Sequence, residues 1–311
     1  MEYAPIIVFV YKRLEQTRKT FESLINNELA RESELYIYSD GPKNEEERKA
    51  VEQVREYIHD SSIRNAFKDV FIKEHNENHG LANSIIMGVS QIISEKGRVI
   101  VVEDDLQASP LFLEYMNECL EFYQNDEKIW SISGYSPELS SLKDYDLNVY
   151  LNFRASTWGW GTWKDRWETV DWEIKDYKKF KYNIKRRMLL CRGGNDMPSM
   201  LKAQMRGKID SWGIRWCYNQ SSQNKLSVAP TVSLIRNNGF DGSGTHSTID
   251  DSKRFLYFEL ENKKKNWRVK KLQLEKEICR EIYKLNSIPM RKRIIEKIQQ
   301  IFGGYVQKKK I

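Results

Sequence analysis

Residues Arg98–Leu113 read "RVIVVEDDLQASPLFL", and this stretch decides the fold class. The apolar run Val99–Val102 has the pattern of a buried strand, and three adjacent carboxylates follow it at Glu103, Asp104 and Asp105. Adjacent carboxylates repel each other, and a bound cation lowers that cost. Because alternate side chains of an extended chain share a face, we expect Glu103 and Asp105 on one side and Asp104 on the other.

Strand and helix patterns alternate on both sides of this stretch. Such alternation predicts an α/β fold with right-handed crossovers and a mostly parallel sheet flanked by helices. Ligands of these sheets bind beyond the carboxyl ends of the strands, where Asp40, residues 78–80 and the three carboxylates all fall. The predicted strands are 6–11, 34–39, 70–73, 99–102 and 129–133, and the predicted helices are 15–24, 44–57, one within 76–93, and 110–123.

Composition narrows the class of protein. A chain of 311 residues with 40% hydrophobic content can bury a large core. The apolar run near the N-terminus is too short for a secretory signal, and no window approaches the roughly 18 apolar residues of a membrane span. The four cysteines form no C-x-x-C pair. We therefore expect reduced thiols and a cytoplasmic protein.

The net charge of +7 is concentrated at the C-terminal end. From Lys263 onward there are 16 Lys/Arg and 4 Asp/Glu, which leaves 35 basic and 40 acidic residues in 1–262. Nucleic-acid enzymes spread positive charge over the body, so no nucleic-acid partner is expected. We predict a catalytic domain at 1–262 and a basic helical tail at 263–311.

The tail carries an amphipathic pattern. Its apolar stripe has two interpretations: a peripheral contact with an anionic inner leaflet of the cell membrane, or packing on the catalytic domain. The stripe consists of Ile294, Ile298, Ile301, Phe302 and Tyr305, and basic residues occupy the other faces.

Oxygen-only ligands select a hard ion, Mn²⁺ or Mg²⁺. The alternative is a solvated acidic turn beside the positive end of the helix near Pro110, but the preceding strand and the neighbouring loops favour a metal. A cation with few protein ligands completes its shell with substrate phosphates, which points to a nucleotide diphosphate. Neither a P-loop nor a G-x-G-x-x-G fingerprint is present.

Seven motifs carry a family resemblance over about residues 4–250: "VFVYKR", "YSDGP", "NHGLANSIIMG", "VVEDDLQASPLFLEY", "WGWGTW", "DSWGIRW" and "NNGFDGSGTH". In this order they resemble the GT-A glycosyltransferases. They are most similar to the N-acetylglucosaminyltransferase I group and to bacterial sugar transferases of surface polysaccharide synthesis. The resemblance implies a GT-A fold and inverting transfer of a sugar from a UDP-sugar to a glycan or lipid-linked acceptor.

The resemblance also implies roles for individual residues. Asp105 would bind the metal directly, and Glu103 and Asp104 would bind the sugar and ribose of the donor. From the residues alone, Arg13 would be interpreted as an exposed charge at the end of a strand, and Asp40 as a turn-forming residue before Gly-Pro. Further donor contacts implied near the base and ribose are Arg13, Asp40, His79 and Asn83.

Inverting displacement needs a general base. In the resembling family the general base is an acidic residue in the matching Trp-rich segment, often the residue immediately after the Trp. In this chain Gly213 follows Trp212, and the nearest acid is Asp210. Asp210 is the predicted base, with a helix N-cap as the alternative.

The segment "NNGFDGSGTHS" is rich in glycine, and the resemblance favours a lid over the diphosphate rather than a surface turn. His246 of this segment would contact either the metal or the phosphate, and the sequence does not decide between these two partners.

The tryptophans divide into two groups. Trp160, Trp163 and Trp167 recur at helical spacing, which is typical of packing. Trp158 is the candidate for stacking on a sugar, and Trp212 is expected beside it in the acceptor pocket.

Two other functions remain open at this point. Nucleotidyl transfer uses similar carboxylates, but normally adds a Gly-rich basic loop after the first strand, where this chain has "YKRLEQT". A non-catalytic carbohydrate-binding protein on the same fold is the other alternative.

Overall fold

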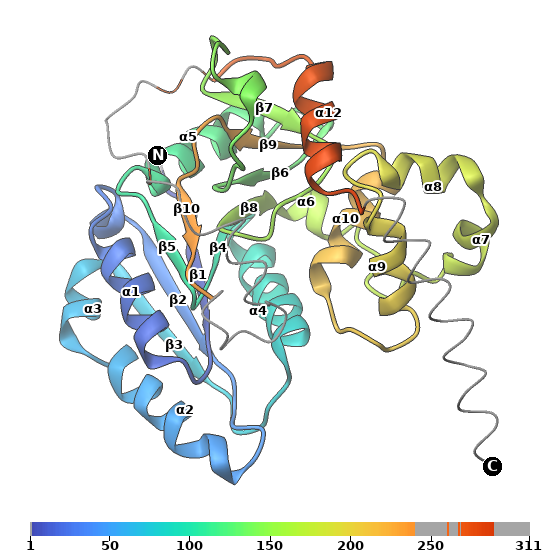
Figure 1. Ribbon diagram of the computed structural model, residues 1–311. Helices are drawn as coiled ribbons and strands as arrows, with labels where there is room; N and C mark the ends of the chain where they lie inside the picture. The colour runs from blue at the N-terminus through green and yellow to red at the C-terminus, as the bar shows by residue number, and fades with distance from the viewer. Residues whose placement is uncertain (1, 240–259, 261–266, 268, 289–311) are drawn as a thin grey trace, which may run out of the picture.

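The computed structural model describes residues 2–239, 260, 267 and 269–288. The first half of the chain alternates strands and helices (Figure 1). Its elements are β1 (Ile6–Val10), α1 (Leu14–Ile25), η1 (Ala30–Glu32), β2 (Glu34–Ser39), α2 (Glu45–Ile58), α3 (Ser61–Ala66), β3 (Asp69–Glu74), α4 (Leu81–Lys96), β4 (Arg98–Glu103), β5 (Leu106–Ala108), α5 (Phe112–Tyr123) and β6 (Ile129–Ser133).

The second half is more irregular, and helices predominate in its middle. Its elements are η2 (Ser140–Leu142), β7 (Val149–Asn152), β8 (Trp160–Trp163), α6 (Lys164–Trp167), α7 (Tyr177–Tyr182), α8 (Ile184–Cys191), α9 (Met197–Gln204), α10 (Trp212–Ser222), β9 (Leu226–Pro230), β10 (Ile235–Asn237) and α12 (Lys276–Leu285).

The strands form an eight-stranded sheet in the order β3-β2-β1-β4-β8-β6-β9-β7, and β10 pairs with β5 in a separate two-stranded sheet. Strands β3, β2, β1 and β4 are parallel neighbours. From β1 the chain moves outward to β3, and then returns to β4 on the other side of β1. This reversal of direction creates a switch point between β1 and β4, where open α/β sheets bind ligands. The predicted α/β fold with a mostly parallel sheet is confirmed.

The side chains of the central strands alternate between two hydrophobic layers. Ile6, Val8 and Val10 of β1 pack with α1, α2, α3 and α5 on one face. Ile7 and Phe9 point to the other face, where α4 and α10 cover the sheet. Because both faces are covered, β1 and β4 read as continuous apolar runs in the sequence.

Strand β8 is the element that joins the two halves of the sheet. It lies antiparallel between β4 and β6, with Gly161 opposite both Ile100 and Ile132. A Cβ atom at Gly161 would lie 2.8 Å from the carbonyl oxygen of Val99, so glycine permits this close pairing. Trp160 and Trp163 therefore lie on a strand, and the helix that their spacing suggested is not formed at these residues. The prediction that these rings serve packing is confirmed, because both are buried.

Part of the basic tail packs on the main body. Ile278 and Ile282 of α12 are buried in a cluster that includes Tyr150. The Glu281 carboxylate accepts hydrogen bonds from the amide (3.0 Å) and hydroxyl (2.7 Å) of Ser141. Helix α12 (Lys276–Leu285) thus packs on the main body. The predicted stripe from Ile294 to Tyr305 lies outside the described residues.

Within the described ranges, no helix is long and apolar enough to cross a membrane. All four cysteines are free thiols, as expected.

Arg166 is a buried cation that closes the end of β6, and it provides a test of the fold. Its side chain is 2% exposed and donates to the carbonyl oxygens of Ile129 (3.2 Å), Gln124 (2.8 Å) and Asp126 (3.0 Å). Arg166→Met leaves these carbonyls without their donor, so we expect a loss of about 3 kcal/mol in the free energy of unfolding, measured by urea denaturation. The exposed control Arg206→Met should change it by less than about 0.5 kcal/mol. Equal effects of the two substitutions would contradict this account.

Candidate active site

The acidic cluster, defined as Glu103, Asp104 and Asp105, consists of the last residue of β4 and the first two residues of the turn that follows it. Arg13, which directly precedes α1, contacts two members of the cluster. Its Nη2 donates to Asp104 Oδ1 and to Asp105 Oδ2, the latter at 3.0 Å. The extended strand ends at Glu103, so Asp104 and Asp105 both reach the same guanidinium. The predicted alternation of these side chains about an extended chain was therefore wrong.

One guanidinium does not balance three carboxylates. Burial raises the pKa of Glu103 to about 8, and repulsion from Asp105 and Asp104 adds to the effect. Burial also raises the pKa of Asp104 to about 6, against the opposing charge of Arg13. Asp104 Oδ2 is buried and has no hydrogen-bond partner among the described residues. A buried, unpartnered carboxylate oxygen in an under-compensated cluster fits a hard divalent cation.

The protein offers few ligands for such an ion. No group of three His, Cys, Asp or Glu side chains in the described ranges is arranged to hold a metal. A cation held here would complete its shell with oxygen atoms of a bound substrate, as Mg²⁺ does with phosphates.

Asp40, which follows β2, holds the loop at the start of α4. Its Oδ1 accepts from the amide of His79 and its Oδ2 from the amide of Gly80, both at 2.9 Å. Asn83 Nδ2 donates to the His79 carbonyl (3.0 Å), and the His79 ring contacts His75 edge-on at 4.8 Å. Asp40 is thus a turn-forming residue, the alternative that sequence reasoning kept open.

A cavity of about 480 Å³, the first cavity, opens at the switch point between β1 and β4. Glu103 and Asp104 line one side, and Asp210 from the helical region lines another. The structure therefore brings four of the predicted donor-site residues to one space, Arg13, Asp40, Glu103 and Asp104. Asp105, His79 and Asn83 lie near this cavity in the sequence but are not part of its lining. The remaining lining includes Phe9, Tyr11, Lys12, Arg13, Tyr38, Asp40, Lys43, Glu47, His75, Asn78 and Gly80.

Sequence reasoning missed several residues of the first cavity. Tyr38 lies stacked near His75, with ring centroids 6.3 Å apart, and forms an aromatic wall. Lys12 and Tyr11 both hydrogen-bond to Glu47, so α2 is tied to the end of β1. The signal was available in part, because Tyr11 and Lys12 directly precede Arg13 in "VYKR".

Asp210 is exposed, with 62% of its side chain accessible, and Arg215 Nη2 donates to its Oδ1 at 3.0 Å. The N-cap of α10 is Ser211, whose hydroxyl accepts from the amide of Ile214. The N-cap alternative for Asp210 was therefore wrong by one residue. Asp210 remains a carboxylate that faces the cavity without a capping role.

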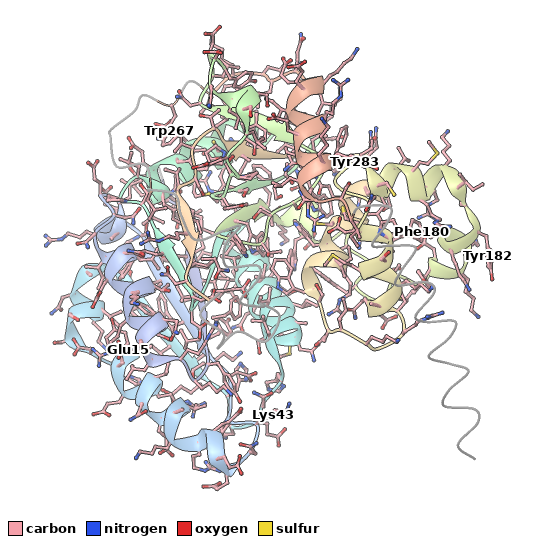
Figure 2. The ribbon with its side chains drawn as sticks, viewed as in Figure 1. Glu15, Lys43, Phe180, Tyr182, Trp267 and Tyr283 are labelled. Carbon is pink, nitrogen blue, oxygen red and sulfur yellow. The ribbon has the colours of Figure 1, made fainter. Side chains whose placement is uncertain are left out.

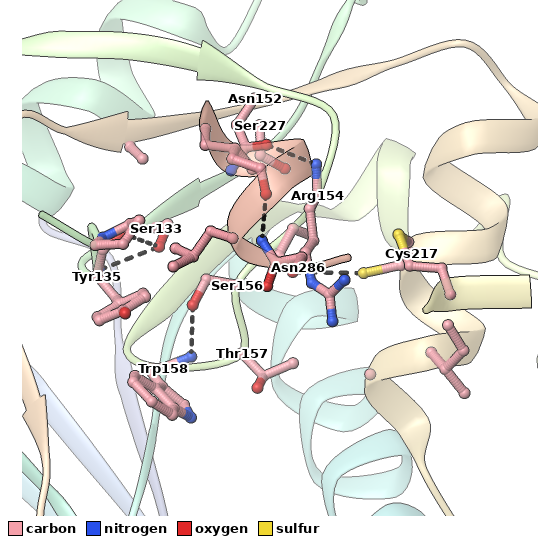
Figure 3. A pocket seen from close by; sticks show the side chains of 18 of the residues that line it. Ser133, Tyr135, Asn152, Arg154, Ser156, Thr157, Trp158, Cys217, Ser227 and Asn286 are labelled. Atoms are coloured by element: carbon pink, nitrogen blue, oxygen red, sulfur yellow. Dashed lines mark hydrogen bonds between the residues drawn. The ribbon is translucent and has the colours of Figure 1, made fainter. Parts of the chain in front are cut away.

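A second cavity of about 260 Å³ lies on the other side of Asp210, since the next residue, Ser211, and Gly213 both line it. Figure 3 shows Trp158 and Tyr135 at one end and Arg154 deeper inside. Arg154 is held by Asp196 through two hydrogen bonds of 2.9 and 3.0 Å. Trp158 stands edge-on to Tyr135 at 4.5 Å, while Trp212 does not line either cavity.

Comparison with known proteins identifies the family. The model of the GNT-I family matches residues 1–167, which is more than half of the chain. The chain belongs to the GNT-I family. No curated protein sequence matches it significantly.

Solved structures resemble this GNT-I family chain only distantly. The mannosyltransferase PcManGT from Pyrobaculum calidifontis, in complex with GDP-Man and Mn²⁺, has a TM-score of 0.37 and 12% identity over 52% of this chain and 46% of that one. TarS from S. aureus has a TM-score of 0.32 and 16% identity over 42% of this chain and 21% of that one. UDP-glucose pyrophosphorylase complexed with UDP-glucose has a TM-score of 0.36 and 13% identity, over 73% of this chain and 90% of that one. The chain thus spans less than half the length of the first two, and likenesses this weak say nothing about substrate.

The GNT-I match ends at Trp167, so it covers the acidic cluster, Arg13, Asp40 and Trp158 but not Asp210. Trp212, expected in the acceptor pocket, is 4% exposed and packs on Trp160 at 5.0 Å.

The glycine-rich segment begins beside the acidic cluster. Strand β10 pairs with β5, and the amide of Asn238 donates to the Asp105 carbonyl at 2.8 Å. A Cβ atom at Gly239 would lie 2.2 Å from Asp105 Oδ2, so this approach requires glycine. The rest of the predicted lid, including His246, lies outside the described residues.

The two amide contacts of Asp40 provide a test of how the loop is held. In Asp40→Asn one carboxylate oxygen becomes an NH₂ group that faces an amide donor, so one hydrogen bond is lost. We expect the free energy of unfolding to fall by about 1–2 kcal/mol and amide exchange at His79 and Gly80 to accelerate. The matched control Asp69→Asn, at an exposed site, should change neither. Unchanged exchange at both amides would refute the positioning role.

Proposed function

We propose that this protein transfers a sugar, with inversion at the anomeric carbon, from a UDP-sugar to a hydroxyl group of a glycan or lipid-linked acceptor. The observation that carries the proposal is the first cavity, where Glu103 and Asp104 face Asp210 across the switch point of a GNT-I family chain. Family membership favours sugar transfer over nucleotidyl transfer and over sugar binding without catalysis. Surface polysaccharide synthesis is the proposed setting.

The first cavity is the proposed donor site. The acidic cluster fits Mn²⁺ or Mg²⁺, with Asp105 as its direct ligand and Glu103 and Asp104 turned to the sugar and ribose. When bound, the cation would neutralise charge on the leaving diphosphate. Tyr38 offers a flat ring for the base, and Lys12 and Lys43 add positive charge at the rim.

Arg13 holds Asp104 and Asp105 in place, and Asp40 positions the loop that carries His79 and Asn83. His246 would contact the diphosphate or the metal from the glycine-rich segment.

The second cavity is the proposed acceptor site. Its lining is mostly apolar, and the partly exposed Trp158 ring offers a surface for the C–H groups of a sugar. Asp210 lines the first cavity, and the next residue, Ser211, lines the second. An acceptor hydroxyl placed between the two cavities would therefore face the anomeric carbon of the donor. Trp212 would support this wall from behind, through its contact with Trp160.

The chemical step follows from this arrangement. Asp210 takes the proton of the acceptor hydroxyl while its oxygen forms the new bond to the anomeric carbon. The bond from that carbon to the diphosphate oxygen breaks, and the nucleoside diphosphate leaves. Arg215 holds the Asp210 carboxylate through the 3.0 Å hydrogen bond.

We further propose residues 1–262 as the catalytic domain and 263–311 as a basic tail that meets the anionic inner face of the cell membrane. Helix α12 would join the two, because its apolar side packs on the domain. The protein would then act as a cytoplasmic enzyme held at the membrane periphery.

Asp105→Asn tests the metal and donor site. For the unmodified protein, UDP with Mn²⁺ should raise the melting temperature, since a ligand present at 100 times its Kd adds about 2.7 kcal/mol. The variant should lose the Mn²⁺-dependent part of this shift, because an amide is a poorer ligand for a hard cation than a carboxylate. The exposed control Asp146→Asn should keep it. If Asp105→Asn retains the full Mn²⁺-dependent shift, Asp105 is not the metal ligand and this assignment is wrong.

Asp210→Asn tests the general base. We expect kcat to fall by about 10²–10⁴-fold, while the KM for the donor changes little, because the amide cannot accept the proton. Arg215→Gln should lower kcat less, since it removes only the residue that holds Asp210. The rates are measured as release of nucleoside diphosphate with acceptor present. If kcat survives in Asp210→Asn, another carboxylate of the first cavity is the base.

A further inference from the structure

A strongly basic helical hairpin, α7–α8, projects from the side of the molecule opposite α2 and α3 (Figure 1). Between Tyr177 and Arg192 the sequence "YKKFKYNIKRRMLLCR" contains seven Lys/Arg and no Asp/Glu. Neither the proposed donor site nor the proposed acceptor site uses any of these residues. The hairpin therefore needs its own explanation.

The hairpin is firmly attached to the body. Phe180 is 3% exposed and meets the Tyr218 ring edge-on at 5.2 Å. Leu190 is 1% exposed in the same core. Arg186 donates to Asp176 at 2.6 Å and to the Tyr218 hydroxyl at 2.7 Å. These inward contacts fix which side of the hairpin faces outward.

The outer side carries large apolar side chains that nothing in the described structure covers. Tyr182 is 78% exposed, Ile184 is 73% exposed and Met188 is 66% exposed, the highest values for large hydrophobic residues in the described ranges. Ile184 and Met188 lie one helical turn apart on α8, so they share a face. Figure 2 shows Phe180 directed towards the neighbouring helices and Tyr182 directed outward.

Unpaired cations surround these apolar side chains. Two of the hairpin's cations are occupied, Arg186 by Asp176 and Arg192 by Asn224. The other five are exposed and form no ion pair with any described residue: Lys178, Lys179, Lys181, Lys185 and Arg187.

We propose that the outer side of the α7–α8 hairpin docks on an anionic lipid surface. Long basic side chains reach phosphate groups while their stems, and the side chains of Tyr182, Ile184 and Met188, enter the boundary between headgroups and acyl chains. A purely polyanionic partner would attract the lysines but would leave three large apolar groups in water. The combination of charge and exposed apolar surface therefore selects a membrane.

The hairpin's position gives this docking a structural consequence. Helix α8 packs against α9 and α10, and Met197 and Met200 of α9 line the second cavity. Docking would hold that cavity near the lipid surface. The proposal concerns a different surface from the basic tail, and it does not depend on sugar transfer, because vesicle binding needs neither donor nor metal.

The experiment is co-sedimentation of the full chain with vesicles of phosphatidylcholine alone or mixed with phosphatidylglycerol. The charge variant replaces four hairpin lysines by glutamine, and the apolar variant replaces the three exposed hydrophobic residues by serine. Matched controls alter four exposed lysines and two exposed phenylalanines elsewhere. The charge variant is Lys178→Gln, Lys179→Gln, Lys181→Gln and Lys185→Gln; the apolar variant is Tyr182→Ser, Ile184→Ser and Met188→Ser; the controls are Lys19→Gln, Lys49→Gln, Lys68→Gln and Lys128→Gln, and Phe71→Ser with Phe122→Ser.

We expect salt-sensitive binding to the anionic vesicles only. Each lysine near the surface contributes about fivefold to partitioning, so the charge variant should bind at least about tenfold more weakly than its lysine control. The apolar variant should also bind more weakly than the phenylalanine control, with an unchanged circular dichroism spectrum. Unchanged vesicle binding in the charge variant would assign it to other surfaces, such as the tail, and overturn the proposal. So would an apolar variant that binds like its control, because the hairpin would then recognise charge alone.

Discussion

Arg13 forms ion pairs with Asp104 and Asp105. These ion pairs connect the segments that follow β1 and β4, the two neighbouring strands at the switch point. Arg13 lies three residues after the end of β1, and its partners directly follow β4, so one guanidinium connects the carboxyl ends of neighbouring strands. Thr20 of α1 adds a hydrogen bond to the Asp104 carbonyl at 2.9 Å, and the Asn238 amide adds one to the Asp105 carbonyl. The backbone of the acidic turn is thus held by two hydrogen bonds, and its side chains are held by Arg13.

The charges of the same turn are deliberately less well satisfied than its backbone. A second arginine would neutralise the cluster and lower the pKa of Glu103, but it would also remove the electrostatic gain from binding a cation. The buried Asp104 Oδ2 has no hydrogen-bond partner among the described residues and so carries a desolvation cost, which the proposed cation would offset. Gly239 follows the same logic, because any side chain there would occupy the space beside Asp105. The electrostatic cost at this point is the kind that a sequence keeps at a functional site.

The sequence predicted the parallel half of the fold closely and the antiparallel half poorly. Strands at 34–39 and 129–133 were placed to the residue, because both are short runs rich in aromatic and β-branched residues. Strands β5 and β10 have three residues each and pair across more than a hundred residues of chain, so neither carries a local pattern.

The tryptophan spacing misled for a related reason. Trp160 and Trp163 are three residues apart, a separation that fits a helix as well as it fits a strand with one ring on each face. Only the pairing of β8 with β4 decides between them, and it is a contact between distant parts of the chain. For the site, strand ends placed Glu103, Asp104 and Asp40 correctly at one edge, but the roles of Asp40 and Arg13 in holding backbone and charge depend on partners that no motif names.

Ring packing helps to hold the helix that follows Asp210 against the sheet, in addition to the hydrogen bond of 2.9 Å from the Ala155 amide to Gln220 of α10. Trp160 of β8 contacts Trp212 and Trp216 of α10 at 5.0 and 5.5 Å. The indole nitrogens of Trp160 and Trp216 are buried and have no hydrogen-bond partner among the described residues. Contacts of this kind are lost steeply with small displacements, because dispersion depends on close approach. This packing therefore helps to position the segment that carries the exposed Asp210, so Trp160, Trp212 and Trp216 would contribute to the proposed site through position alone.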